Sequence, residues 1–137
     1  MQYNIPVSKE ERNNWEQRYS SHDYKPREKP SDLLTQWIDR LPPGKALDLA
    51  CGTGRNSIFL AEKGYEVTAI DISPAAIEMA KNKARGKGLK INWIAADLEK
   101  FKISGRYDII LSFFYVNKKI VPNIIKSLNT GGILIFV

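Results

Sequence analysis

The stretch that decides the fold is Ala46-Leu-Asp-Leu-Ala-Cys-Gly-Thr-Gly-Arg-Asn-Ser57. Its first five residues, 46–50, are predicted to form a short buried strand, and residues 55–63 a helix. Gly52 and Gly54 lie between them, where glycine lets the backbone approach a ligand and leaves helix N–H groups pointing at it. A tight strand-to-helix turn that binds no ligand explains Gly-x-Gly equally well. Other residues are therefore needed to show whether a ligand binds here.

Apolar strands and amphipathic helices alternate after this stretch. The further strands are predicted at residues 66–70, 91–95, 107–114 and 133–137, the last entered through a Gly131-Gly132 turn. One helix begins at Ser73-Pro74 and ends near Gly86 or Gly88, and a short one covers residues 121–128. This alternation is typical of an α/β fold with a doubly wound, mostly parallel sheet.

The chain is predicted to be one compact unit with two parts. Residues 1–43 form an N-terminal helical lead-in, and residues 44–137 form the sheet with its helices. In the lead-in, one helix carries Trp15, and a second is predicted to be capped by Ser31 and to end at Pro42-Pro43.

Composition narrows the class of protein. The 137 residues are 43% hydrophobic and 26% charged, as in a single soluble globular domain. No apolar run approaches the roughly 18 residues of a membrane span, and no signal peptide is recognisable, so a cytoplasmic protein without a membrane partner is expected. The single cysteine, Cys51, excludes an intrachain disulfide and a cysteine-rich zinc site, and no metal is expected.

The net charge of +6 does not by itself predict a nucleic-acid partner. The densest basic cluster falls at the end of a predicted helix and consists of Lys81, Lys83, Arg85, Lys87 and Lys90. Cations at that end complement the helix dipole, and no aromatic residues are interleaved for stacking on bases. A solvated helix face is therefore favoured over a nucleic-acid surface.

An acidic residue strengthens the case for a ligand at the glycine turn. Asp71 ends the next predicted strand, about 20 residues further on, where a carboxylate accepts hydrogen bonds from both hydroxyls of a ribose. Asp71 and Asp97 each also fit a simpler role as caps of the elements that follow them. Together with the glycine turn, they favour an adenosine-type ligand.

Two details distinguish between a dinucleotide and S-adenosylmethionine. The dinucleotide fingerprint has a third glycine where this chain has Ser57. Asp48 also places a carboxylate near the turn, which disfavours a pyrophosphate but suits the ammonium and sulfonium of S-adenosylmethionine. The residues therefore predict S-adenosylmethionine as the cofactor.

These motifs resemble those of the class I S-adenosylmethionine-dependent methyltransferases, and within them the tellurite-resistance-like and thiopurine-methyltransferase-like small-molecule branch. Besides the glycine turn, the resemblance is carried by Val67-Thr-Ala-Ile-Asp-Ile-Ser-Pro-Ala-Ala-Ile77, Ala95-Ala-Asp-Leu98, Tyr107-Asp-Ile-Ile-Leu-Ser112 and Gly131-Gly-Ile-Leu-Ile135. It covers Leu41 to the C-terminus well and the lead-in loosely. It implies a Rossmann-like fold and methyl transfer to a small molecule.

The resemblance also implies which residues bind the cofactor. They are Asp48, Ala50, Cys51, Gly52, Gly54, Asp71, Ile72, Asp97, Leu98 and Ser112. The glycine turn would hold the methionine portion, with Asp48 serving its ammonium directly or through water. Asp71 would hold the ribose and Ile72 would pack against the adenine. Asp97 would accept from the adenine amine, and the backbone N–H of Leu98 would meet a ring nitrogen.

The acceptor side is less well defined by the resemblance. Ser112 would line the opening toward the methyl acceptor, and the lead-in would fold over the cofactor as a lid. The candidate acceptor residues are Trp15, Tyr19, Tyr24, Phe113 and Tyr115. An aromatic residue at a strand end also fits a hydrophobic core, which is the alternative for Phe113 and Tyr115.

The chain offers no obvious catalytic base. Its one histidine, His22, lies in the polar part of the lead-in, and Cys51 fits small buried filler better than a nucleophile. The cofactor carries the reactivity, so a soft sulfur, selenium or tellurium nucleophile needs no strong base. Residues 112–115, Ser-Phe-Phe-Tyr, also differ from the Asn-Pro-Pro-Tyr of amino-methylating branches, which disfavours adenine methylation.

The expected sheet is truncated at its fifth strand, because the family's sheet continues beyond the point where this chain ends. Residues 133–137 would then form an apolar edge, so either the chain is a fragment of a longer protein, or a partner chain or a second copy covers this edge. Two alternatives stay open: a non-catalytic cofactor-binding fragment or scaffold, and, less favoured, an NAD-dependent oxidoreductase.

Overall fold

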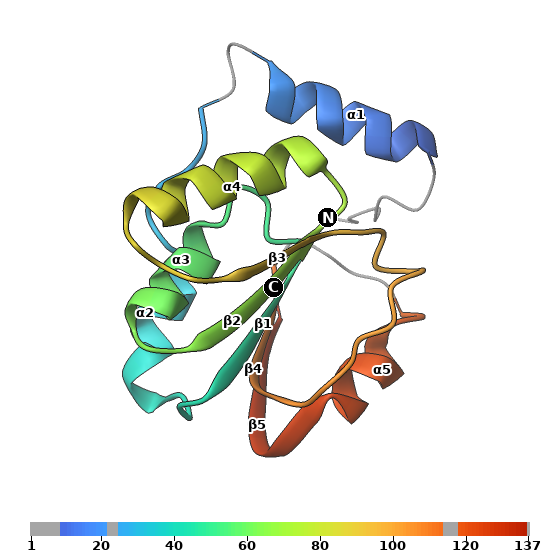
Figure 1. Cartoon of the computed structure of the whole chain (residues 1–137). Coiled ribbons are helices and arrows are strands. Elements are labelled where there is room, and N and C mark those ends of the chain that lie inside the picture. Colours follow the sequence, from blue (N-terminus) through green and yellow to red (C-terminus); the bar gives the residue numbers. More distant parts are fainter. Residues whose placement is uncertain (1–8, 22–24, 114–117, 137) are drawn as a thin grey trace.

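Five parallel strands form one sheet at the centre of the molecule (Figure 1). The computed structural model describes residues 9–21, 25–113 and 118–136. Its strands are β1 (Lys45–Leu49), β2 (Glu66–Asp71), β3 (Asn92–Ala95), β4 (Tyr107–Ser112) and β5 (Leu128–Phe136). They lie side by side in the order β3-β2-β1-β4-β5, and every neighbouring pair is parallel. The predicted α/β fold with a parallel sheet is confirmed.

Helices cover both faces of this sheet. They are α1 (Lys9–Ser20), α2 (Asp32–Trp37), the short 3-10 helix η1 (Ile38–Arg40), α3 (Arg55–Glu62), α4 (Pro74–Gly86) and α5 (Val121–Lys126). Figure 1 shows α2, α3 and α4 on one side, α5 on the other, and α1 lying along α4. In the described part of the chain, none of the helices has the length and apolar character needed to cross a membrane.

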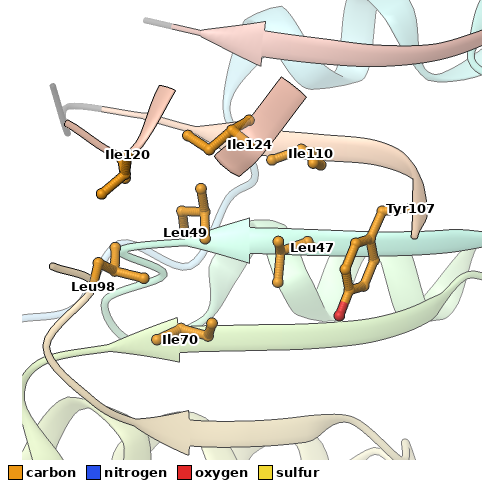
Figure 2. Packing of buried hydrophobic residues seen from close by; sticks show 8 residues of the cluster. All are labelled: Leu47, Leu49, Ile70, Leu98, Tyr107, Ile110, Ile120 and Ile124. Carbon is orange, nitrogen blue, oxygen red and sulfur yellow. The ribbon is translucent and has the colours of Figure 1, made fainter. Parts of the chain in front are cut away.

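Two hydrophobic clusters, one on each face, hold the sheet between its helices. Leu47 and Leu49 of β1 belong to the cluster beneath α5, and Ala46 belongs to the cluster on the opposite face. Figure 2 shows the first cluster, which consists of Leu47, Leu49, Ile70, Leu98, Tyr107, Ile110, Ile120 and Ile124. Since both faces are covered, the central strands are apolar along nearly their whole length.

The start of α4 agrees with its prediction. Ser73 is the N-cap, with Pro74 as the first helical residue, and the Ser73 hydroxyl accepts a hydrogen bond from the Ala76 N–H at 3.1 Å. The buried side of the helix carries Ala76, Ile77, Ala80 and Ala84. The 3.6-residue spacing of these apolar residues is therefore what seats α4 on the sheet.

The prediction of strand β5 was wrong in its start and in the role of its glycines. The strand begins at Leu128, and the preceding helix ends at Lys126. Gly131, with φ +80°, lies inside the strand at a shift of register, because Tyr107 pairs with Leu128 but Ile109 pairs with Ile133. Residues 131–132 therefore form an irregularity within the strand, where glycine permits the bulged backbone, and do not form a turn before it.

The second lead-in helix also differs from its prediction. Ser31 occupies the N-cap of α2, but its side chain makes no capping hydrogen bond. Its backbone N–H instead donates to Oδ1 of Asn56 at 2.8 Å, which ties the start of α2 to α3. The α-helix ends at Trp37, and the last turn before Pro42 is the 3-10 helix η1.

Gly54 provides a direct test of this packing, because it is constrained in two ways. Its φ is +87°, and a Cβ placed there would lie 2.7 Å from the Trp93 ring and 2.9 Å from the Ala80 methyl. Gly54→Ala is therefore expected to lower the free energy of unfolding by about 1–2 kcal/mol for the backbone and roughly 1–3 kcal/mol more for the overlap. Urea unfolding followed by circular dichroism measures this loss.

Gly64→Ala is the matched control. Gly64 has a similar φ, +94°, but nothing lies within 4 Å of its added Cβ. Only the backbone contribution, about 1–2 kcal/mol, is expected there. Equal losses for the two variants would contradict the packing constraint on Gly54.

Candidate functional site

The candidate site lies where the sheet's connections change direction. From β1 the chain proceeds to β2 and β3 on one side, while β4 and β5 lie on the other. Ligands of open α/β sheets bind at the carboxyl ends of the strands beside such a point. In register, Leu49 at the end of β1 lies between Ile70 of β2 and Ser112 of β4. The turn after β1 therefore comes together with the residues that follow β2 and β4.

The turn after β1 has an unusual backbone. Gly52 and Gly54 have φ values of +58° and +87°, and Ala50 also has φ +58°. Within the described ranges, Ala50 is the one non-glycine residue with a positive φ, a conformation that costs about 1–2 kcal/mol for an L-residue. The Cys51 N–H donates to the Ile70 carbonyl at 2.9 Å and fixes the turn against β2. Strain of this kind persists where the surroundings enforce it, and it is concentrated at functional sites.

Asp71 connects this turn to the start of α4. Its Oδ1 accepts from the Gly52 N–H at 3.1 Å, and its Oδ2 accepts from the Ser73 N–H at 3.0 Å. The side chain is almost fully buried, with 6% exposed. The capping role considered for Asp71 is thus present. Each carboxylate oxygen has a second lone pair, so the same group has acceptor capacity left for a ligand.

Asp48 is paired with a residue whose role the sequence did not reveal. Its Oδ2 accepts from the Ser57 hydroxyl at 2.6 Å, and both side chains are buried. In the sequence, Ser57 stood out only as the residue in place of the third glycine of a dinucleotide fingerprint. The structure shows that it anchors α3 to a buried carboxylate. The spacing of Asp48 and Ser57 in the sequence does not predict this hydrogen bond, because the bond depends on how α3 crosses β1.

Burial changes the acid–base chemistry of the turn. Burial raises the pKa of Asp48 to about 7, although the Ser57 hydrogen bond opposes the change, and nearby Asp71 raises it further. Burial likewise raises the pKa of Asp71 to about 6, against the opposing hydrogen bonds from Ser73 and Gly52. Two carboxylates that are costly to ionise therefore flank the turn, and a cation placed there would favour their charged forms.

Cys51 lies between these carboxylates and is not an activated thiol. Burial raises the pKa of Cys51 well above its usual value, and the charges of Asp71 and Asp48 raise it further. The thiol is then protonated at neutral pH, and a protonated thiol is a poor nucleophile. The half-buried thiol of Cys51 is therefore disfavoured as a nucleophile, and its packing role stays a prediction.

Helix α1 brings two residues of the lead-in, Tyr19 and Glu16, to the site, and Trp15 stacks on the first of them. The rings of Trp15 and Tyr19 stack with their centres 5.8 Å apart. The Tyr19 hydroxyl lies over Gly52, since a Cβ on that glycine would be 3.2 Å from it. Glu16, which sequence reasoning did not single out, accepts a hydrogen bond on Oε1 from the Ala75 N–H at 2.6 Å. Its signal in the sequence is only its position between two aromatic residues.

The other predicted cofactor residues lie along the same edge of the sheet. Ile72 is half-buried between β2 and α4, and Ser112 is buried at the end of β4. Asp97 follows β3, and its Oδ1 accepts from the Glu99 N–H at 3.0 Å. The Leu98 side chain belongs to the cluster beneath α5. A ligand would therefore contact the backbone of Leu98 and not its side chain.

Of the acceptor residues predicted outside α1, Phe113 is the one that lies within the described ranges. The Phe113 side chain is buried in a hydrophobic cluster with Leu34 and Leu111. Tyr24 and Tyr115 lie outside the described residues. Their roles stay predictions.

Comparison with known proteins places this architecture in a family. Residues 14–134 match the family model described as tellurite resistance protein TehB. A Haemophilus influenzae protein named "Probable S-adenosyl-L-methionine-dependent methyltransferase TehB" is 36% identical over 99 residues, covering 67% of this chain and 35% of that protein. The ubiquinone biosynthesis O-methyltransferase of Rickettsia canadensis is 31% identical over 109 residues, covering 76% of this chain and 46% of the relative.

Solved structures agree. The crystal structure of TehB from Haemophilus influenzae superposes with a TM-score of 0.70 and 28% identity, covering 89% of this chain and 44% of that one. A methyltransferase from Clostridium acetobutylicum, dependent on S-adenosylmethionine, gives a TM-score of 0.65 and 27% identity, covering 76% of this chain and 46% of that one.

The chain thus spans between about a third and a half of the length of these proteins. The Rossmann-like fold implied by the sequence motifs is confirmed. The chain belongs to the TehB family of S-adenosylmethionine-dependent methyltransferases.

Proposed function

We propose that this chain binds S-adenosylmethionine at the turn after β1 and transfers its methyl group to a small-molecule acceptor. The observation that carries the proposal is the pair of buried carboxylates, Asp48 and Asp71, beside the turn, with pKa values raised to about 7 and about 6. Such a site favours the ammonium and sulfonium of S-adenosylmethionine and repels a pyrophosphate. This charge balance also argues against an NAD-dependent oxidoreductase.

The residues at the edge of the sheet fit the parts of this cofactor. In the proposal, the strained turn from Ala50 to Gly54 holds the methionine portion, with Cys51 as filler and Asp48 serving the ammonium. Asp71 holds the ribose with the acceptor capacity that its two backbone hydrogen bonds leave. Ile72, Asp97 and the backbone N–H of Leu98 hold the adenine.

The chain contributes position and shielding to the reaction. When bound, S-adenosylmethionine supplies an electrophilic methyl group on its sulfonium. Helix α1, with Tyr19 above Gly52 and Trp15 stacked on Tyr19, covers the turn and excludes water from it. Ser112, at the end of β4, lines the path of the acceptor. We therefore assign the lead-in, residues 1–43, the role of a lid over the sheet domain.

A soft nucleophile suits this site best. Sulfur, selenium and tellurium nucleophiles attack without a strong general base, which agrees with a chain that has one histidine, His22, and with a protonated thiol at Cys51. The description of the matched family, tellurite resistance, agrees with an acceptor of this kind. We further propose a cytoplasmic location, in keeping with the free thiol of Cys51.

Cofactor binding is tested by isothermal titration with S-adenosylmethionine. Asp71→Asn is expected to weaken binding by about tenfold or more, because hydrogen bonds to a charged acceptor contribute roughly 1.5–3 kcal/mol. Asp39→Asn, an exposed carboxylate on η1, is the matched control and should bind as the unchanged chain does. Tighter binding of NAD than of S-adenosylmethionine would overturn the assignment.

The raised pKa of Asp48 predicts a pH dependence of the same affinity. Below about pH 7 the folded chain holds a proton on Asp48, and a cationic ligand has to displace it. Affinity should therefore rise with pH, by at most tenfold per unit for one group, between about pH 5.5 and about pH 7.5. In the Asp48→Asn variant, the rise in affinity near pH 7 should disappear. The rise near pH 6, which comes from Asp71, should remain.

Turnover is tested with methyl-labelled S-adenosylmethionine and a panel of thiols, selenite and tellurite. The proposal predicts transfer of label to at least one of them, with the rate reduced in Asp71→Asn. Tight binding without transfer to any member of the panel would leave the non-catalytic alternative as the better description.

A further inference from the structure

The Glu16 carboxylate spans the contact between the lid helix and the candidate site. Its Oε1 accepts from the Ala75 N–H, in the first turn of α4, at 2.6 Å. One helical turn further along α1, the Tyr19 hydroxyl lies over Gly52. Asp71 binds the backbone on both sides of this contact, at Gly52 and at Ser73. The Glu16 carboxylate thus lies beside the one on Asp71, and its charge contributes to the raised pKa of Asp71.

The second oxygen of Glu16 is buried without a partner. Among the residues that the structure describes, none donates a hydrogen bond to Oε2, although this atom is buried from solvent. A buried acceptor without a donor destabilises the fold, and it does so more when it is charged. A neighbouring carboxylate adds repulsion. Oε2 of Glu16 therefore calls for a hydrogen-bond donor in the neighbourhood of Asp71.

We infer that Glu16 is a second ribose-binding carboxylate, whose Oε2 accepts a hydrogen bond from a ribose hydroxyl of S-adenosylmethionine beside Asp71. This inference rests on the cofactor proposed above. It makes Glu16 a cofactor-binding residue of the lid, so that bound cofactor holds α1 closed.

A ribose diol matches the geometry better than a single donor does. The two oxygens of Asp71 each already accept one backbone N–H, which restricts the directions left for two hydroxyls. Glu16, on α1, supplies a further acceptor, Oε2, which has no hydrogen-bond partner among the described residues. The two ribose hydroxyls would then donate hydrogen bonds to the carboxylates of Asp71 and Glu16. The ribose itself brings no further charge to the site.

The Glu16→Gln substitution tests the role of Oε2 separately from that of Oε1. The amide keeps an oxygen to accept from Ala75 N–H, so the connection to α4 is preserved, and its NH2 replaces the free oxygen with a donor. The substitution also removes a charge that repels Asp71, so the ligand-free variant should unfold at an equal or higher temperature. Its affinity for S-adenosylhomocysteine, measured by titration calorimetry, should fall about tenfold or more. Glu78→Gln, an exposed residue of α4, removes the same charge and should change neither quantity.

A ligand series shows whether the lost affinity belongs to the ribose. The 2′-deoxy and 3′-deoxy analogues of S-adenosylhomocysteine each lack one hydroxyl. One of them should bind the unchanged chain about tenfold or more weakly, and Glu16→Gln should weaken that analogue no further. Amide hydrogen exchange should also show that S-adenosylhomocysteine protects α1 in the unchanged chain more than in Glu16→Gln.

The outcomes separate the two proposals. Binding of S-adenosylhomocysteine to the unchanged chain with equal or tighter binding to Glu16→Gln would overturn the role of Glu16 alone, and tighter binding would mean that Glu16 competes with the cofactor. Equal losses for all three ligands would also overturn it, because the effect would not involve a hydroxyl. Absence of binding to the unchanged chain would overturn the proposed function and this inference together.

Discussion

The buried carboxylate of Asp71 is the group on which the arrangement of the site depends. It holds the N–H of Gly52 and the N–H of Ser73, and so joins the turn after β1 to the start of α4. With the turn fixed in this way, Ala50 keeps a backbone conformation that an alanine seldom adopts. With α4 fixed, α1 has a surface to lie on, and its residues come over the turn. One side chain thus fixes the turn after β1 and the start of α4, on which α1 in turn lies.

Burying several carboxylates at one edge of the sheet has an electrostatic cost, and this cost indicates which kind of ligand the site favours. Asp48 and Asp71 are buried with raised pKa values, and Glu16 adds a third carboxylate at the same edge. A fold selected for stability alone gains nothing from such a group of carboxylates. Their presence is understandable when a cationic ligand rich in hydroxyl donors completes the site, because it supplies what each carboxylate lacks.

The sequence predicted those features that depend on local pattern. The strands followed from short apolar runs, and the start of α4 followed from Ser73 and Pro74, because both signals act within a few residues. Gly131 was misjudged as a turn, since a bulge inside a strand depends on the register of its neighbour. The Ser57–Asp48 bond and the hydrogen bond between Glu16 and Ala75 were missed for a related reason. Each joins residues whose approach is decided by how helices cross the sheet, which no short-range pattern records.

Gly54 shows how firmly the turn is tied to the rest of the fold. The ring of Trp93, on the edge strand β3, and the methyl of Ala80, on α4, occupy the space that any larger residue at 54 would need. Enlarging the turn in a redesign or in a diverging relative would require a smaller residue at 93 as well as tolerance of a left-handed backbone. Positions 54, 80 and 93 should therefore change together during evolution, although only position 54 belongs to the turn after β1.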